Sequence, residues 1–163
     1  MPLTGGLRDR MILESIIQYI KSDLSLRGWF DTNRQHAPIV IVDEYPDNEE
    51  VQINTLAVSF GMSAQDRLEL GSKAELHRWA IYVDFYAESD ALGRHVIGDI
   101  YETINRDMAI PVYDYSLATP VQDFILDVVD ESVEKSKPTN ATNPWQRHWH
   151  ILSFAVEDSR ANA

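Results

Sequence analysis

Leu76–Pro111, with the sequence LHRWAIYVDFYAESDALGRHVIGDIYETINRDMAIP, decides the fold of this chain. The stretch begins with alternating apolar and polar side chains, which is typical of a β-strand. It continues with apolar residues three and four positions apart, which indicates an amphipathic helix. It ends in a short apolar run that carries a proline. A long strand, a helix and a second strand therefore follow one another directly.

The first strand is expected over Glu75–Ala87. One of its faces is fully apolar, because it carries Trp79, Ile81, Val83 and Phe85. The opposite face mixes tyrosines with charges, because it carries Arg78, Tyr82, Asp84 and Tyr86. Tyrosines beside charged residues are typical of surfaces that meet another chain.

The helix is expected to begin after Ser89, whose hydroxyl can cap it, and to end near Arg106. Asp90 in the first turn complements the helix dipole. Gly93 and Gly98 each cost up to about 1 kcal/mol relative to alanine inside a helix. Close packing of the helix on a sheet would explain both glycines. The apolar stripe consists of Val96, Ile97, Ile100, Tyr101 and Ile104.

A polar turn cluster at Lys137–Pro144 predicts that the last two strands form a hairpin. The alternation switches face near Thr55–Leu56, which predicts a bulge or bend there. Gly28 is a stop signal for the first helix. The other predicted elements are a helix over Leu7–Leu26 and strands over Ile39–Val42, Val51–Met62, Ile110–Tyr115, Val121–Lys135 and Trp145–Glu157.

This order of elements predicts an α+β fold, a mostly antiparallel mixed sheet with two main helices packed on one face and long β-hairpin arms. The two arms, Arg67–Ala87 with its partner strand and Val121–Glu157, exceed the usual strand length. The 163 residues suit a single domain over the whole chain. Met1–Gly6 is expected to be a flexible leader and Ser159–Ala163 a polar tail.

The chain is acidic, with 26 Asp and Glu against 14 Lys and Arg and a formal net charge of −12. Specific nucleic-acid binding depends on basic residues that neutralise phosphates, so this role is not expected. There is no cysteine, which excludes disulfides and thiolate sites. No apolar run approaches the roughly 20 residues of a membrane span, and no signal peptide is recognisable. We expect a soluble protein made in the cytoplasm.

No nucleotide-binding loop or nucleophile motif occurs. His148 and His150 lie two apart on a predicted strand and share a face, so with His77 or His95 they would form a metal site. A histidine pair on an aromatic strand is more often part of a core or an interface.

Four acids, Asp84, Glu88, Asp90 and Asp99, cluster around the strand-to-helix junction. Paired carboxylates serve in acid–base or metal-dependent catalysis. No lysine accompanies them, and helix capping explains Asp90 more simply. We therefore predict no catalytic, cofactor-binding or metal-binding residue and no cofactor. A metal-dependent enzyme that uses Asp84, Asp99 and the His148–His150 pair stays open as a minor alternative.

Two groups of residues are candidates for assembly. The acids of the long strand either coat a solvated hairpin arm or line a passage; they are Asp123, Asp127, Asp130, Glu131 and Glu134. Four aromatic residues expected to be exposed either contact a neighbouring subunit or pack on their own chain; they are Tyr82, Tyr86, Trp145 and Trp149.

Several segments together resemble the tail terminator proteins of long-tailed bacteriophages, those of actinobacterial phages most of all. The segments are RWAIYVDFYAES at Arg78–Ser89, GDIY at Gly98–Tyr101, AIPVYDY at Ala109–Tyr115 and WQRHWHILSFAVED at Trp145–Asp158. The resemblance covers about Met11–Arg160 and rests on the order of elements and on aromatic texture, not on an invariant motif.

The resemblance implies a small α+β subunit of a homo-hexameric ring in the virion, at the neck of the tail. Such a ring caps the head-proximal end of the tail tube, stops polymerisation of the tube protein and contacts the head–tail connector. DNA passes through its lumen without specific binding, and no membrane is involved. The related tail-to-head joining proteins share the fold, so a connector or stopper role is the main alternative. The family has no catalytic residues.

Overall fold

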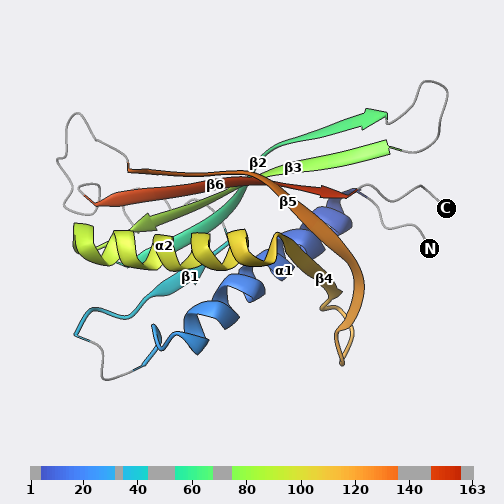
Figure 1. The fold of residues 1–163 in the computed structure, drawn as a ribbon. Helices are drawn as coiled ribbons and strands as arrows, with labels where there is room; N and C mark the ends of the chain where they lie inside the picture. Colours follow the sequence, from blue (N-terminus) through green and yellow to red (C-terminus); the bar gives the residue numbers. More distant parts are fainter. Residues whose placement is uncertain (1–4, 32–34, 44–53, 68–74, 136–147, 159–163) are drawn as a thin grey trace.

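The structure, a computed structural model, describes residues 5–31, 35–43, 54–67, 75–135 and 148–158. The described part runs helix, three strands, helix, three strands, in the order predicted from the sequence (Figure 1). The helices are α1 (Gly5–Leu26) and α2 (Asp90–Asp107), and the strands are β1 (Val40–Val42), β2 (Thr55–Arg67), β3 (Glu75–Tyr86), β4 (Ala109–Asp114), β5 (Val121–Lys135) and β6 (Trp149–Asp158).

The six strands form one sheet in the order β1-β2-β3-β6-β5-β4. The short β1 pairs with β2 in parallel, and the other neighbours are antiparallel. The predicted α+β class with a mostly antiparallel mixed sheet is therefore confirmed. The expected pairing of the last two strands is also confirmed, because β5 pairs with β6.

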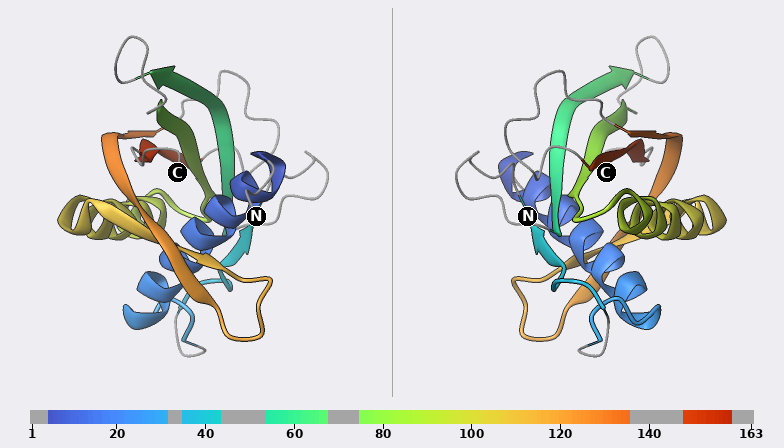
Figure 2. Two further views of the ribbon diagram at one scale, coloured as in Figure 1. Left: turned by 90° about the vertical axis from the view of Figure 1, so that its right-hand side faces the viewer. Right: turned by 90° about the vertical axis from the view of Figure 1, so that its left-hand side faces the viewer.

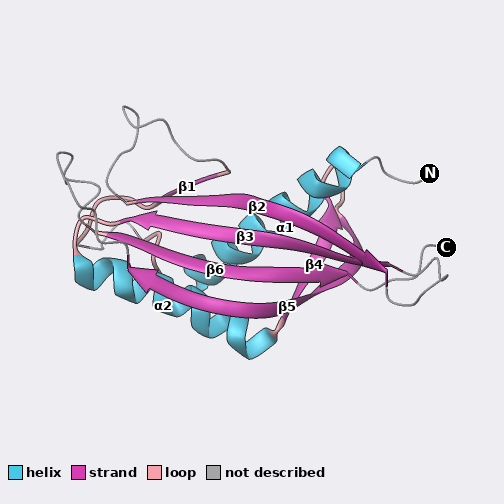
Figure 3. Cartoon of the chain, turned by 90° about the horizontal axis from the view of Figure 1, so that it is seen from above, coloured by secondary structure: helices cyan, strands magenta, loops and turns pink. Residues whose placement is uncertain are grey.

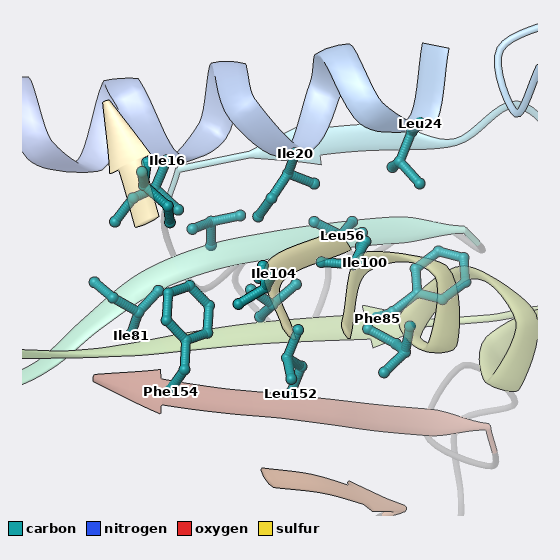
Figure 4. Packing of buried hydrophobic residues seen from close by; sticks show 14 of the residues in the cluster. Ile16, Ile20, Leu24, Leu56, Ile81, Phe85, Ile100, Ile104, Leu152 and Phe154 are labelled. Carbon is teal, nitrogen blue, oxygen red and sulfur yellow. The ribbon is translucent and has the colours of Figure 1, made fainter. Parts of the chain in front are cut away.

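Both helices lie on one side of the sheet, as Figures 1 and 3 show. The apolar stripes of the helices meet the apolar side chains of β2, β3 and β6 there, and these side chains form a continuous core (Figure 4). Strand β5 curves so strongly that its first half pairs with β4 and its second half with β6 (Figure 2). Fully buried members of the core include Ile16, Ile20, Leu56, Ile81, Phe85, Ile100, Ile104 and Leu152.

Helix α2 begins as predicted, since the Ser89 hydroxyl accepts a hydrogen bond from the Leu92 N–H. It ends at Met108, which takes a left-handed conformation with φ 53° and donates its N–H to the Ile104 carbonyl. Close packing explains Gly93, because a side chain there would collide with His150. It does not explain Gly98, where a Cβ would meet nothing within 4 Å.

Several boundary predictions are wrong. β2 continues to Arg67 instead of ending at Met62, and β6 begins at Trp149 and not at Trp145. Helix α1 already includes Gly5 and Gly6, so the expected leader is shorter than Met1–Gly6. The pattern switch near Thr55–Leu56 is the start of β2, and the shift in register lies further along, between Phe60 and Ser63. The predicted turn at Lys137–Pro144 and the tail Ser159–Ala163 lie outside the described residues.

In the part of the chain that the structure describes, neither helix combines the length and the apolar character that crossing a membrane requires.

Candidate functional site

The sheet face that points away from the helices, called the outer face below, carries small side chains at its centre. On β3, Tyr82 pairs with Ser59 of β2 on one side and with Ser153 of β6 on the other. Ser153 in turn pairs with Ser132 of β5, and their hydroxyl oxygens are 2.7 Å apart. Tyr82, at 40% exposure, is the large side chain that rises from this row. The centre of the outer face is therefore polar and partly exposed.

One end of the outer face is acidic. Arg78 of β3 donates from Nε to Glu157 of β6 at 2.8 Å, and its Nη2 reaches the same carboxylate oxygen. Asp127 of β5 is exposed and pairs in register with Glu157. The carboxylates of Glu157 and Asp127 thus outnumber the single guanidinium of Arg78 on these three neighbouring strands, which gives this group a net negative charge.

The other end of the outer face is closed by side chains of the same chain. The rings of Tyr86 and Trp149 stack with their centroids 5.5 Å apart. The indole Nε1 of Trp149 donates a hydrogen bond of 2.8 Å to Asp84, whose side chain is buried.

The expectation that Tyr86 and Trp149 are exposed is therefore wrong. Tyr86 is only 3% exposed and Trp149 is half-buried. The reason is that β3 and β6 bring the two residues into a directly opposed pair, and opposed aromatic side chains pack on each other. Of the four predicted aromatic contacts, Tyr82 is exposed and Trp145 lies outside the described residues.

The acids of β5 do not form one continuous face. A shift in register between Val129 and Ser132 interrupts the alternation that would have kept Glu131 beside Asp127. Glu131 is half-buried, and its Oε1 has no hydrogen-bond partner among the described residues. Asp127 remains an exposed acid. Asp123, Asp130 and Glu134 belong to β5 by their backbone, and their side chains lie outside the described part.

Asn54 holds the junction of three elements together. It is fully buried and takes a left-handed conformation with φ 65° immediately before β2. Its Nδ2 donates to the Ala37 carbonyl at 2.8 Å, and its Oδ1 accepts from the Glu88 N–H at 3.0 Å. Its carbonyl accepts from the Val40 N–H at 2.9 Å. The sequence interpretation missed this residue, although asparagine before a strand is a signal for a left-handed residue.

The helix seam, formed by Asp23, Arg27, Trp29, Asp99 and Thr103, joins α1 to α2. Asp99 accepts a hydrogen bond of 2.8 Å from the Trp29 indole and lies 3.1 Å from Arg27. Asp23 accepts from the Thr103 hydroxyl at 2.7 Å and from Arg27 at 3.2 Å. These contacts give Asp99 a role in packing.

The residues of the alternative metal-dependent enzyme do not converge. Asp84 lies on the outer face with Trp149, whereas Asp99 lies in the helix seam on the other side of the sheet. His150 is buried against α2, with its Nε2 3.4 Å from the Asp90 carboxylate. Within the described ranges, no group of three or more His, Asp or Glu residues is arranged to hold a metal ion.

An open pocket of about 480 Å³ lies at the N-terminal end of α2. His95 lines it together with Trp29, His36 and Glu88. The Oε1 of Glu88 accepts from the Ala37 N–H at 3.3 Å, so this acid supports the junction around Asn54. The four acids near the strand-to-helix junction thus act separately in the structure.

A second group of polar contacts lies at the C-terminal end of α2. The hydroxyl of Tyr19 donates to Asp107, and Arg106 Nε donates to the same carboxylate at 2.8 Å. The hydrogen bonds from Arg106 and from Tyr19 lower the pKa of Asp107 below its usual value. Burial and the neighbouring Asp107 raise the pKa of Tyr19.

No protein-family model matches the chain. No curated protein matches it either. The geometry described above offers a sheet surface and strand edges as candidate sites. The acids whose contacts are described take part in packing or lie at the surface.

Proposed function

We propose that the protein is a structural subunit of a phage tail terminator, a homo-hexameric ring at the head-proximal end of the tail tube in the virion. The ring ends polymerisation of the tube protein and joins the tail to the head–tail connector. The observation that carries the proposal is the packing of both helices on one side of the sheet, which leaves an outer face with an acidic end at Asp127 and Glu157. No catalytic step and no cofactor belong to this role.

The charge of the chain supports a lumen through which DNA passes. A ring of six copies would carry six times the net charge of −12 of one chain. A negative wall repels phosphates, so DNA slides along it without binding. We assign the wall to the outer face, where Arg78 is the basic partner of Glu157 and Asp127 adds a further acid.

The length of the strands also supports a subunit of a larger assembly. β2 and β3 form a long antiparallel pair, from the Thr55/Tyr86 pair to the Arg67/Glu75 pair, and β6 runs beside β3 as far as His77. β2 has 13 residues, β5 has 15, and strands in single domains usually have five or six. A cyclic ring needs two different matching patches on each subunit, and extended arms provide such reach.

Two measurements test the proposal. Native mass spectrometry of the purified chain should give a hexamer, and averaged images of tails should place it at the head-proximal end of the tube. Addition of the protein to polymerising tube protein should shorten the tubes, while an equal amount of an unrelated acidic protein should not. A chain that is strictly monomeric and absent from virions would rule out this function.

Deletion of the gene separates the terminator from the connector or stopper alternative. Loss of a terminator should give overlong tubes that lack the ring joining them to the heads. Normal tubes together with heads that leak DNA would assign the chain to the stopper position instead.

A further inference from the structure

We propose that neighbouring copies of this chain join edge to edge, with β2 of one copy pairing antiparallel to β5 of the next. The inference rests on the proposed ring and names the contact that closes it. It follows from the edges of the sheet, because in the described part of the chain the outer edge of β4 and the start of β2 are covered, whereas the rest of β2 and the far half of β5 have no strand beside them.

The first covered stretch is the outer edge of β4. Ser15 of α1 is 2% exposed and lies against this edge. Its Oγ accepts a hydrogen bond of 3.0 Å from the Tyr113 N–H and lies 3.4 Å from the Tyr113 carbonyl. A side chain that satisfies both backbone groups blocks the addition of another strand.

The edge of β2 is covered only at its beginning. Strand β1 pairs with Thr55–Ala57 and with nothing beyond. Among the described residues, no strand lies beside Val58–Arg67 on the side away from β3. A long strand with an open edge is a template for pairing with another chain.

The second open stretch is the far half of β5. Strand β4 leaves β5 at Asp127, and the last contact is the Val128 N–H donating to the Met108 carbonyl at 3.0 Å. From Val129 to Lys135, within the described part of the chain, only β6 pairs with β5. No other described strand lies along the opposite edge there.

The ladder identifies the groups that point outward. The Ala87 N–H donates to the carbonyl of His148, the residue immediately before β6 begins. Because hydrogen-bonded residues alternate along a strand, every second residue of β3 bonds to β6 and the residues between them bond to β2. Tyr82 therefore bonds to Ser59, and the backbone groups of Val58 and Phe60 point away from β3. By the same alternation Ser132 bonds to Ser153, and the backbone of Val133 points away from β6.

The directions of the two open strands match. Three successive antiparallel steps separate β2 from β5, so the two strands run in opposite directions. When one copy is placed beside the next in the same orientation, β5 of one copy meets β2 of the other in antiparallel alignment.

The two open stretches are also offset along the strands. Val58 and Val133 lie in one row through Val83 and Leu152. From that row the uncovered edge of β2 continues to Arg67. The uncovered edge of β5 continues to Lys135, in the opposite direction along the sheet. Full pairing thus requires each copy to be staggered against the next, and such a stagger is what closes a sheet into a barrel.

Because the chain has no cysteine, a disulfide can test this contact without background. Ser59→Cys together with Ser132→Cys places thiols on the outer face of the two open strands, in one row of the sheet, and so tests pairing without a stagger. Within one chain these positions are three strand spacings apart, about 14 Å, and a disulfide needs Cα atoms within about 7 Å. Mild oxidation of the assembled protein should give a reducible ladder of covalent oligomers. Ala64 pairs with Arg78 on the outer face, so Ala64→Cys with Ser132→Cys samples the staggered register. The cysteine pair that gives the ladder identifies the register of the contact.

Two controls calibrate the ladder. Ser132→Cys with Ser153→Cys joins residues of one chain whose hydroxyls are 2.7 Å apart, so oxidation should give a monomeric product. Each single variant should give no ladder. Strong dimers from Ser59→Cys alone would indicate that β2 pairs with β2 of another copy and would overturn the proposal.

A proline supplies a test that does not depend on register. Val133 is 47% exposed, and proline is tolerated on an edge strand whose N–H is not used within the chain. Val133→Pro should give a folded monomer, whereas the matched Val133→Ala should keep the ring. In the ring, the amides of Val58 and Phe60 should exchange with solvent roughly tenfold or more slowly than in the Val133→Pro monomer.

The outcomes for the contact and for the function are distinguishable. A ring whose Val58 and Val133 amides exchange freely and which gives no ladder would overturn the edge pairing and leave the terminator role intact. The absence of any ring in the unmodified protein would remove the proposed function itself.

Discussion

The imidazole of His150 occupies the space that a side chain at Gly93 would need. A Cβ built on Gly93 would lie 2.2 Å from His150 Cδ2, which is far inside van der Waals contact. The buried ring also lies 3.4 Å from the Asp90 carboxylate, one turn earlier on α2. The approach of α2 to β6 therefore depends on the glycine.

Gly93→Ala should destabilise the fold by about 1–3 kcal/mol, because overpacking outweighs the gain of about 1 kcal/mol in helix propensity. The matched control is Gly98→Ala, since a Cβ there meets nothing within 4 Å. That variant should be stabilised by up to about 1 kcal/mol. Chemical denaturation of both variants measures the difference.

A double variant identifies the cause of the effect. In a His150→Ala background, Gly93→Ala should lose most of its penalty, because the ring that it meets is gone. An unchanged penalty in that background would show that His150 is not the obstacle.

Asn54→Ala should destabilise the fold by about 2–4 kcal/mol. The variant removes the side-chain hydrogen bonds to Ala37 and Glu88 and places alanine at φ 65°. Asn54→Gly loses the same hydrogen bonds without the backbone strain, so it should cost less. Equal losses for the two variants, measured by thermal and denaturant unfolding, would contradict a contribution from the backbone conformation.

Ser15→Ala should cost about 1–3 kcal/mol, because it leaves the Tyr113 N–H without the hydroxyl that accepts from it. It should also promote aggregation, since it uncovers the edge of β4. Ser22→Ala changes an exposed serine on the same helix and should stay within about 0.5 kcal/mol of the parent. Denaturant unfolding and light scattering check the two effects separately.

Asp107 should make the fold sensitive to acid. Its pKa in the folded chain is lowered, first by Arg106 and then by Tyr19, so the folded state binds its proton less readily than the unfolded state. The stabilisation is complete above the unfolded pKa of about 4 and is lost as pH falls through the folded pKa. The free energy of unfolding, measured from about pH 6 to about pH 2, should therefore fall less steeply with acid for Asp107→Asn than for the parent.

Arg106→Gln should act in the same direction, because it removes the largest cause of the lowered pKa. If the parent, Asp107→Asn and Arg106→Gln all show one pH profile, the contact does not contribute to stability.

Local sequence patterns predicted helices and strands well wherever the pattern depends only on residues a few positions apart. The strand over Glu75–Ala87 and the helix after Ser89 were confirmed, because their periodicities of two and about 3.6 are set by the backbone geometry. The limits Val121–Lys135 of β5 were also predicted correctly. A cap such as Ser89 acts within one turn and therefore needs no knowledge of the rest of the fold.

Contacts between distant segments were not predictable in the same way. Tyr86 and Trp149 were expected to be exposed, yet strand register makes them partners across 63 positions of sequence. The buried role of Asn54 and the shifts in register at Phe60–Ser63 and Val129–Ser132 also depend on neighbouring strands. A pattern along one strand contains no information about which residue lies opposite.

The sequence by itself determined the class of fold, the position of α2 and its cap, the acidic charge and the absence of thiol chemistry. Those properties follow from composition and from periodicities that act within a few residues. Only the tertiary structure decided that Gly93 makes room for His150, that Ser15 closes the edge of β4, and that no described strand lies beside parts of β2 and β5. These depend on strand order and register, which arise when segments far apart in the chain bury their apolar faces together.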